Sequence, residues 1–165
     1  MILLAGCRFT QGQIDDGPIT GDAAPDGASD ASNQPIDAPQ GCTQAFALIT
    51  NGTLGHRYQL ESIPRSWTEQ ANACAVENGY LAIPNDATEL AAFEALAGGV
   101  EVWVGVSDRQ TEGAFRDVLN TPYNPSNITI VGNKQADDCA TATDGTTLDV
   151  NPCLESRPGI CECEE

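Results

Sequence analysis

The sequence predicts an α+β domain over residues 42–165, and three features indicate it. Residues 101–106 form a short apolar run with three valines and Trp103, which is typical of a strand buried on both faces. Two segments upstream of this run carry helix-start signals and helical apolar spacing. The half that follows is rich in loops and holds Cys139, Cys153, Cys161 and Cys163. We therefore expect two helices, then a central strand, then a loop-rich half tied by disulfides.

The first helix is expected to begin after Ser66. Ser66 and Glu69 match a capping box, in which the serine accepts from the first turn and the glutamate reaches back to the cap. An apolar stripe at helical spacing follows, and Gly79 ends it. The residues of this stripe are Trp67, Ala71, Cys74 and Ala75. Cys74 is therefore expected to point into the core.

The second helix is signalled by a similar start, in which Asp86 is followed three residues later by Glu89. Its stop signal is the glycine pair at residues 98–99. The residues expected on its inner face are Leu90, Phe93 and Ala97. Three short strands are expected around the helices, at residues 45–49, 56–60 and 80–83, and the first two are joined by a strong tight-turn signal at Asn51-Gly52.

The chain after the central strand is less regular. A long loop rich in asparagine and proline is expected from residue 120 to 135, with a pattern compatible with a short strand at 128–131. Loops of this length in a compact domain are usually functional or disordered. A hairpin with its turn at Asp144-Gly145 is expected next, and the chain closes with a final strand.

The N-terminal 41 residues differ in composition from the rest. Residues 1–7 end in Leu-Ala-Gly-Cys, which resembles the lipobox of bacterial lipoproteins and implies a signal-peptide remnant with a lipid on Cys7. Residues 8–41 are rich in Asp, Gly, Pro and Ala and predict a disordered acidic tether. Their aspartates do not follow the alternating pattern of an EF-hand loop. The expected location is the extracytoplasmic cell envelope, anchored to a bacterial membrane.

The charge balance excludes some partners. The chain has 7 Lys and Arg against 24 Asp and Glu, for a formal net charge of -17. Nucleic acids and anionic lipid surfaces are bound through clustered Lys and Arg, so this chain is not expected to bind either through its side chains. Any membrane association is therefore expected to come from the lipid on Cys7. An acidic surface suits cations, basic proteins or simple solubility.

From residue 42 onward the sequence resembles the C-type lectin-like domain. The correspondence is carried by the order and spacing of several short motifs. They are Trp67, Ala71 and Cys74; Gly79-Tyr80-Leu81-Ala82-Ile83; Glu89; Trp103-Val104-Gly105-Val106 in place of the family's Trp-Ile-Gly-Leu; Asp108, Glu112-Gly113 and Phe115; Asp137-Asp138-Cys139; Cys153; and Pro158-Gly159-Ile160-Cys161-Glu162. The resemblance implies two helices packed on small antiparallel sheets, a long irregular loop region and disulfides.

The resemblance also implies a disulfide pattern. The family pairing gives Cys74–Cys161 and Cys139–Cys153. Cys42 lacks its usual partner, because His56 lies about where that cysteine is expected, and Cys163 is left over on the last strand. We expect these two to form a third bridge, Cys42–Cys163. Three such bridges require an oxidising compartment.

Calcium-dependent sugar binding in this family uses Glu-Pro-Asn or Gln-Pro-Asp in the long loop and a Trp-Asn-Asp triplet. Here residues 131–138 lack the proline and contain Lys134, and the triplet position reads Thr147-Leu148-Asp149. Calcium requires six to eight oxygen ligands, several of them charged. We therefore expect no metal or other cofactor. If calcium does bind, the expected ligands are Asn133, Asp137, Asp138 and Asp149.

An enzyme is not expected, since His56 is the only histidine and is expected to be a surface or edge residue of a strand. The expected function is binding of a glycan or protein at the cell surface through residues 118–138. The residues expected to contact the ligand are Asn120, Tyr123, Asn127, Asn133, Lys134, Gln135, Asp137 and Asp149. Two alternatives remain open: a calcium-dependent carbohydrate-binding lectin, and a structural envelope or matrix protein with no discrete ligand.

Overall fold

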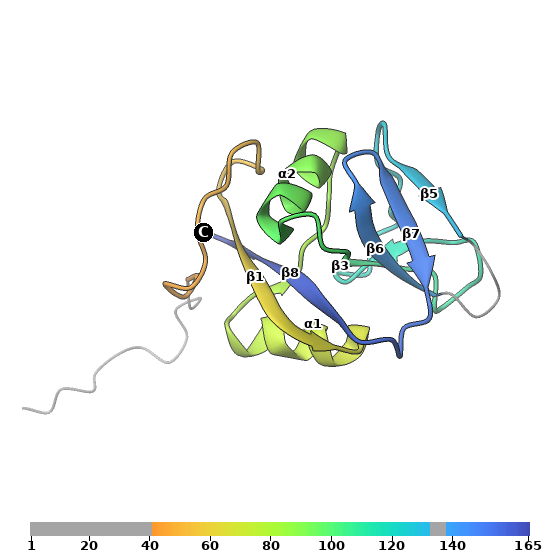
Figure 1. Ribbon diagram of the computed structural model, residues 1–165, viewed down its shortest axis with the longest axis horizontal. Coiled ribbons are helices and arrows are strands. Elements are labelled where there is room, and N and C mark those ends of the chain that lie inside the picture. The colour runs from red at the N-terminus through yellow and green to blue at the C-terminus, as the bar shows by residue number, and fades with distance from the viewer. Residues whose placement is uncertain (1–40, 133–137) are drawn as a thin grey trace, which may run out of the picture. The chain divides into compact units, whose positions relative to one another are not determined.

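The computed structural model describes residues 41–132 and 138–165, and Figure 1 shows their arrangement. Two helices and eight strands are described. In chain order they are β1 (His56–Arg65), α1 (Trp67–Val76), β2 (Tyr80–Leu81), α2 (Ala87–Ala97), β3 (Val102–Ser107), β4 (Arg116–Asp117), β5 (Thr129–Val131), β6 (Cys139–Asp144), β7 (Thr147–Asn151) and β8 (Arg157–Glu164). The α+β class and the order of two helices before a central strand are confirmed.

The strands form one sheet in the order β1-β8-β3-β6-β7-β5, with β2 paired to β8 and β4 paired to β3. The long antiparallel β1–β8 ladder joins the first and last strands of the domain, with His56 opposite Glu164. The hairpin β6–β7 turns at residues 144–147, as predicted, and β5 adds to β7 in parallel. In Figure 1, α1 lies on one side of the β1–β8 ladder and α2 lies on the other.

The two helices begin as their sequences predict. The Ser66 hydroxyl accepts from the Glu69 N–H, and the Glu69 side chain accepts from the Ser66 N–H, which completes the capping box of α1. In α2 the Asp86 carboxylate accepts from two N–H groups of the first turn, and Gly98 adopts the left-handed conformation at the end. The predicted stripe of α1 is wrong at one position, because Ala75 is exposed, whereas the helix buries a glutamine, Gln70.

Strand β3 lies at the centre of the core, and its alternating side chains serve two apolar clusters. Val102, Val104 and Val106 face α2 and the β6–β7 hairpin, whereas Trp103 faces the cluster that contains α1 and the cysteines. All four side chains are fully buried, so the prediction of a strand covered on both faces is confirmed. Gly105 lies where the chain after β2 crosses close to β3, and its N–H donates to the Ala82 carbonyl at 2.8 Å.

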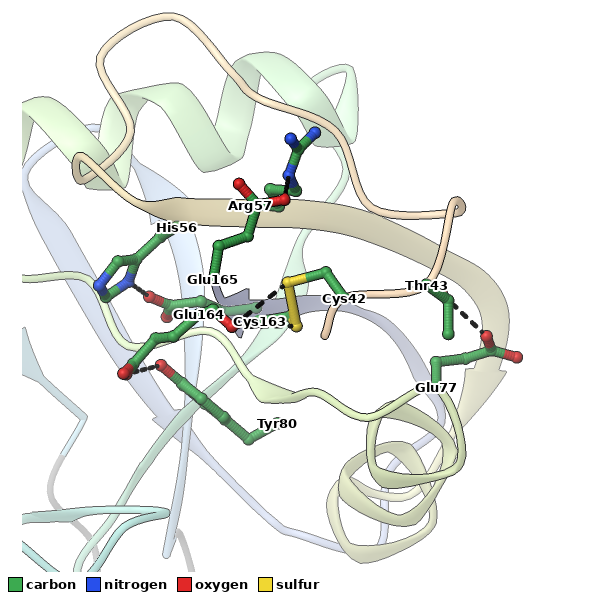
Figure 2. Close-up of a disulfide and its surroundings, with 10 residues drawn as sticks. Cys42, Thr43, His56, Arg57, Glu77, Tyr80, Cys163, Glu164 and Glu165 are labelled. Atoms are coloured by element: carbon green, nitrogen blue, oxygen red, sulfur yellow. Dashed lines mark hydrogen bonds and ion pairs between the residues drawn. A yellow bond between two sulfur atoms is a disulfide. The ribbon is translucent and has the colours of Figure 1, made fainter. Parts of the chain in front are cut away.

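The disulfide prediction is confirmed in full. The three bridges are Cys74–Cys161, Cys139–Cys153 and Cys42–Cys163, with Cα–Cα distances of 5.3, 5.1 and 5.6 Å. The first joins α1 to β8, and the second closes the base of the β6–β7 hairpin. The third attaches the start of the domain to β8, next to the ion pair between Arg57 and Glu165 (Figure 2).

The segment before β1 differs from its prediction. Residues 45–49 form no strand, because a single isolated bridge between Ala47 and Tyr58 is the extent of their pairing in the described structure. Ala45, Ala47 and Leu48 are exposed, and the buried side chain of this segment is Phe46. The apolar run therefore belongs to an irregular segment over β1 and β8, which we call the strap (residues 42–55). A tight turn does form here, one residue earlier than predicted: the Gly52 N–H donates to the Ile49 carbonyl at 3.3 Å across Thr50 and Asn51, and Asn51 has a positive φ of 66°.

Within the described ranges, neither helix has the length and apolarity needed to span a lipid bilayer.

Candidate functional site

The predicted ligand-binding loop runs along one edge of the domain between β4 and β6. Its described part covers residues 118–132, with Asp138 on the far side, and it carries the short strand β5 that the sequence pattern indicated. Asn120 and Asn127 are both exposed, with positive φ values of 65° and 63°. These are backbone conformations that asparagine tolerates better than most residues. The two side chains therefore extend from tight turns toward solvent.

Tyr123 has a structural role as well as a place on this loop. Its hydroxyl donates to the Pro84 carbonyl at 2.6 Å, and its half-buried ring packs against the main core. Burial, together with the nearby negative charges of Glu89 and Asp117, raises the pKa of Tyr123 well above its usual range. The tyrosine therefore stays a neutral donor and fastens the loop to the segment between β2 and α2.

A polar pocket of about 230 Å³ lies beside this tyrosine. Its walls come from the loop and from the turn before α2. The residues around it are Ile83, Asn85, Asp117, Thr121, Pro122, Tyr123, Asn124 and Pro125. Amide, hydroxyl and carboxylate groups alternate with a tyrosine ring and two prolines. This mixture provides both donors and acceptors on a semi-rigid surface, which suits a small polar ligand.

The other predicted ligand residues divide between described and undescribed parts of the chain. Asn133, Lys134, Gln135 and Asp137 lie outside the described residues, as do Cys7 and residues 8–40 of the predicted 8–41 tether. Asp138 is half-buried, and its carbonyl accepts from the Asp108 N–H at 3.1 Å. Asp149 lies on β7, where its carboxylate accepts from the Thr143 hydroxyl at 3.0 Å.

The geometry of β7 bears on the calcium question. Leu148 and Val150 point into the core, so Asp149 is the residue of that stretch whose carboxylate faces outward. In the β6–β7 ladder Asp149 pairs with Thr141, three positions from Asp138, which corresponds to about 10 Å along a strand. Within residues 41–132 and 138–165, no group of three or more His, Cys, Asp or Glu side chains is placed to hold a metal ion.

Two polar features were not found from the sequence. His56 was expected at a surface or edge; it does lie on the edge strand β1, but its ring Nδ1 contacts the buried carboxylate of Glu162. Burial raises the pKa of Glu162, against the lowering effect of the Ile83 N–H and His56. Two arginines of the β3–β4 hairpin, Arg109 and Arg116, also line a common pocket. Local sequence spacing indicates neither feature. The His56–Glu162 contact depends on how β1 aligns with β8, and the meeting of the two arginines depends on how the two arms of the hairpin align.

Two helices on a sheet, a bridge from the first helix to the last strand, and a second bridge under a long loop define a C-type lectin-like module. The profile of the Lectin C-type domain matches residues 63–163, which is more than half of the chain. The chain belongs to this family, whose members are binding proteins.

Individual relatives agree with this assignment. Human C-type lectin domain family 4 member F is 31% identical over 80 residues, which are 48% of this chain and 14% of that protein. The carbohydrate-recognition domain of the mouse scavenger receptor C-type lectin has a TM-score of 0.63 at 19% identity, covering 75% of this chain and 97% of that one. A calcium-independent type II antifreeze protein has a TM-score of 0.63 at 22% identity, covering 74% and 94%. The two structures share the fold, and the chain spans a small part of the human relative.

Proposed function

We propose that this domain recognises a glycan or protein ligand through the loop at residues 118–138, without the usual calcium site of the family. The pocket beside Tyr123 is the observation that carries the proposal, because it lies on this loop and presents amide, hydroxyl and carboxylate groups. The loop is held by the Tyr123–Pro84 hydrogen bond, and a fixed surface loses less entropy when it binds.

Three observations support binding without calcium. The outward face of β7 contributes one carboxylate, that of Asp149, which is already engaged by Thr143. Leu148 stands where the family's triplet has an amide ligand, and its fully buried hydrocarbon side chain has no oxygen to offer a metal. The type II antifreeze protein of the same fold is calcium-independent, so the fold does not depend on the ion.

A glycan array probed with the full chain, with and without a calcium chelator, tests the proposal. We expect binding that the chelator leaves unchanged, and a loss of binding in Asn124→Ala, since Asn124 is exposed and lines the pocket. Asn72→Ala is the matched control, because Asn72 is an exposed asparagine on α1. Binding abolished by the chelator, with saturable calcium uptake in calorimetry, would favour the calcium-dependent lectin.

An array and a cell-extract capture that both stay empty would instead favour a structural envelope or matrix protein with no discrete ligand.

We further propose that the chain is a bacterial lipoprotein, held in the cell envelope by a lipid on Cys7, with residues 8–41 as an acidic tether. The Leu-Ala-Gly-Cys sequence and the composition of the tether support this proposal. The three disulfides agree with an oxidising compartment outside the cytoplasm.

A further inference from the structure

A second, larger pocket lies between the start of α1 and the β3–β4 hairpin, adjacent to the ligand loop. Its volume is about 390 Å³. The side chains around it include Trp67, Arg109, Gln110, Arg116, Asp117 and Asn120. Asp117 also lines the pocket beside Tyr123, so the two pockets share a wall.

The two arginines of this pocket differ from the other described arginines. Arg57, Arg65 and Arg157 each form an ion pair with at least one glutamate. Arg109 and Arg116 have no ion pair with any carboxylate in the described ranges. In a chain with 24 acidic and 7 basic residues, two such arginines facing one pocket form a local positive site. The two guanidinium groups outnumber the one carboxylate of the lining, that of Asp117, so the pocket carries net positive charge and attracts anionic ligands.

Both guanidinium groups are held in position by neutral partners. Arg109 lies over the Trp67 ring, 5.4 Å from its centroid, and donates to the Thr68 hydroxyl at 3.4 Å. Arg116 donates to the Asn120 carbonyl at 2.8 Å. A guanidinium carries five N–H donors, so most of the donors in each group remain for a ligand. These contacts fix the positions of both guanidinium groups and leave their positive charges unneutralised.

The amides at the pocket add a second kind of recognition. The Gln110 side chain donates to the Asn120 side-chain oxygen at 3.4 Å, which leaves further amide donors and an acceptor directed to solvent or ligand. Amides of this kind match the hydroxyl groups of a sugar. The Asp117 carboxylate accepts from the Thr121 N–H at 2.8 Å, on the side shared with the loop pocket. Its negative charge repels the acid group of a ligand, which is therefore directed toward the two arginines.

We propose that this pocket is a subsite for an acidic sugar, in which Arg109 and Arg116 bind the carboxylate or sulfate ester and Gln110 and Asn120 bind ring hydroxyls. Guanidinium groups match the geometry of carboxylate and sulfate oxygens through paired hydrogen bonds. The inference rests on the proposed function and narrows it from glycans in general to glycans that carry an acid group.

The test combines a glycan array with nuclear magnetic resonance titration of the ¹⁵N-labelled full chain. The titration probes are sodium glucuronate, glucose 6-sulfate and, as the neutral match, glucose. We expect the two acidic probes to shift the side-chain amide signals of Gln110 and Asn120, and glucose not to shift them. In Arg109→Gln/Arg116→Gln the affinity for acidic sugars should fall about tenfold or more for each arginine removed.

The matched control is Arg57→Gln/Arg65→Gln, which changes the net charge equally at two ion-paired arginines away from the pocket. It should keep the wild-type affinity, and circular dichroism should show both double variants folded. If the pocket variant misfolds, the titration of the wild-type chain still decides, because glucuronate must shift Gln110 and Asn120.

The outcomes separate this inference from the proposed function. Binding of neutral glycans alone would overturn the acidic subsite and leave the proposed function in place. Equal binding of acidic sugars by both double variants would place their site elsewhere and also overturn it. An array with no glycan bound would reject glycan recognition altogether, and capture of acidic peptides by the arginine pocket would replace the sugar with a peptide. A preference between glucuronate and the sulfate would identify the acid group.

Discussion

Two buried glutamates, Glu89 and Glu162, connect parts of the domain that are distant in sequence. Glu89, 2% exposed, accepts from the Thr53 N–H and hydroxyl at 3.0 and 2.8 Å, from the Asn85 N–H at 2.9 Å, and from the Tyr58 hydroxyl. It also lies in the first turn of α2, where the helix dipole favours a negative charge. Glu162, 1% exposed, has fewer partners, which are the Ile83 N–H and the His56 ring. Because more donors bind its carboxylate, Glu89 is expected to contribute more to stability than Glu162.

The raised pKa of Glu162 predicts a pH dependence of stability. A carboxyl whose pKa is higher in the folded than in the unfolded state stabilises the fold fully below the unfolded value of about 4.5, and this contribution is lost as pH rises through the folded pKa. Glu162→Gln mimics the protonated carboxyl. We therefore expect the Tm of Glu162→Gln, relative to the Tm of the wild type, to rise as the pH increases from 4 to 7.

Glu77→Gln changes the net charge equally at a partly exposed site and is the control for this comparison. A difference in Tm between wild type and Glu162→Gln that stays constant with pH would contradict the assignment.

Gly105 tests the close approach of two chain segments at a single residue. A Cβ added there would lie 2.1 Å from the Leu81 carbonyl oxygen, which belongs to the backbone and cannot rotate away. Gly105→Ala should lower the free energy of unfolding by about 1–3 kcal/mol or more, because overpacking forces the backbone to move. Gly41→Ala, which meets nothing within 4 Å, should leave the denaturant midpoint unchanged. Equal midpoints for the two variants would refute this account of the crossing.

At the scale of elements, the strap at residues 42–55 is attached to the domain at a few points. They include the Cys42–Cys163 bridge, the Ala47–Tyr58 backbone pair, the Phe46 side chain and the Thr53–Glu89 hydrogen bonds. Thr43 adds a hydrogen bond to Glu77 at the end of α1, visible in Figure 2. Because regular pairing is sparse, the covalent bond carries more of the attachment than it would in a strand.

Removing that bridge should therefore loosen the strap without unfolding the rest. In Cys42→Ala/Cys163→Ala we expect faster amide hydrogen exchange at residues 42–55, while β3 and α1 keep their protection. The loss of stability should be at most about 4–5 kcal/mol, the chain-entropy value for a loop of this length. Cys139→Ala/Cys153→Ala is the matched comparison, and its effect should be confined to β6, β7 and the adjacent loop. Uniform loss of protection in both variants would contradict the picture of a separate strap.

The helices were predictable from sequence because their signals are local. Ser66, Asp86 and Gly98 act within one turn of their own position, so the pattern alone indicates where each helix begins or ends. The strap was not predictable, since whether residues 45–49 pair as a strand depends on what β1 and β8 leave available. Gln70 is a similar case: its amide is buried because it donates to the Glu61 carbonyl at 3.3 Å, a partner in another element.

The candidate site was predicted only in part for the same reason. The loop at residues 118–138 could be proposed from its length and composition, and Asn120, one of its predicted ligand residues, lines the arginine pocket. The arginine pocket could not be proposed, because Arg109 and Arg116 come together only through the pairing of Ser107 with Arg116 in the β3–β4 hairpin. Tyr123 was predicted as a ligand residue, and the structure adds its hydrogen bond to Pro84, which no spacing rule indicates.

At the scale of the whole molecule, the formal charge of -17 separates two ways of reaching a membrane. Side chains of such a chain are repelled by anionic lipid headgroups, so adsorption through the protein surface is disfavoured. A lipid on Cys7 would not depend on this charge, because acyl chains partition by burying apolar surface. The acidic composition of residues 8–41 would then keep the domain away from the bilayer to which it is attached.

The proposed anchor leads to a prediction about the protein from its native host. Peptide mass spectrometry should find Cys7 acylated, and the protein should fractionate with membranes and stay there in high salt, because acyl chains are not screened by ions. Cys7→Ser should move it entirely to the soluble fraction, while the disulfide-bonded domain keeps its fold and its ligand affinity. An unmodified Cys7 thiol, or membrane association that persists in Cys7→Ser, would contradict the anchor. Ligand recognition by the loop at residues 118–138 and by the arginine pocket would be unaffected, since both sites lie within residues 42–165.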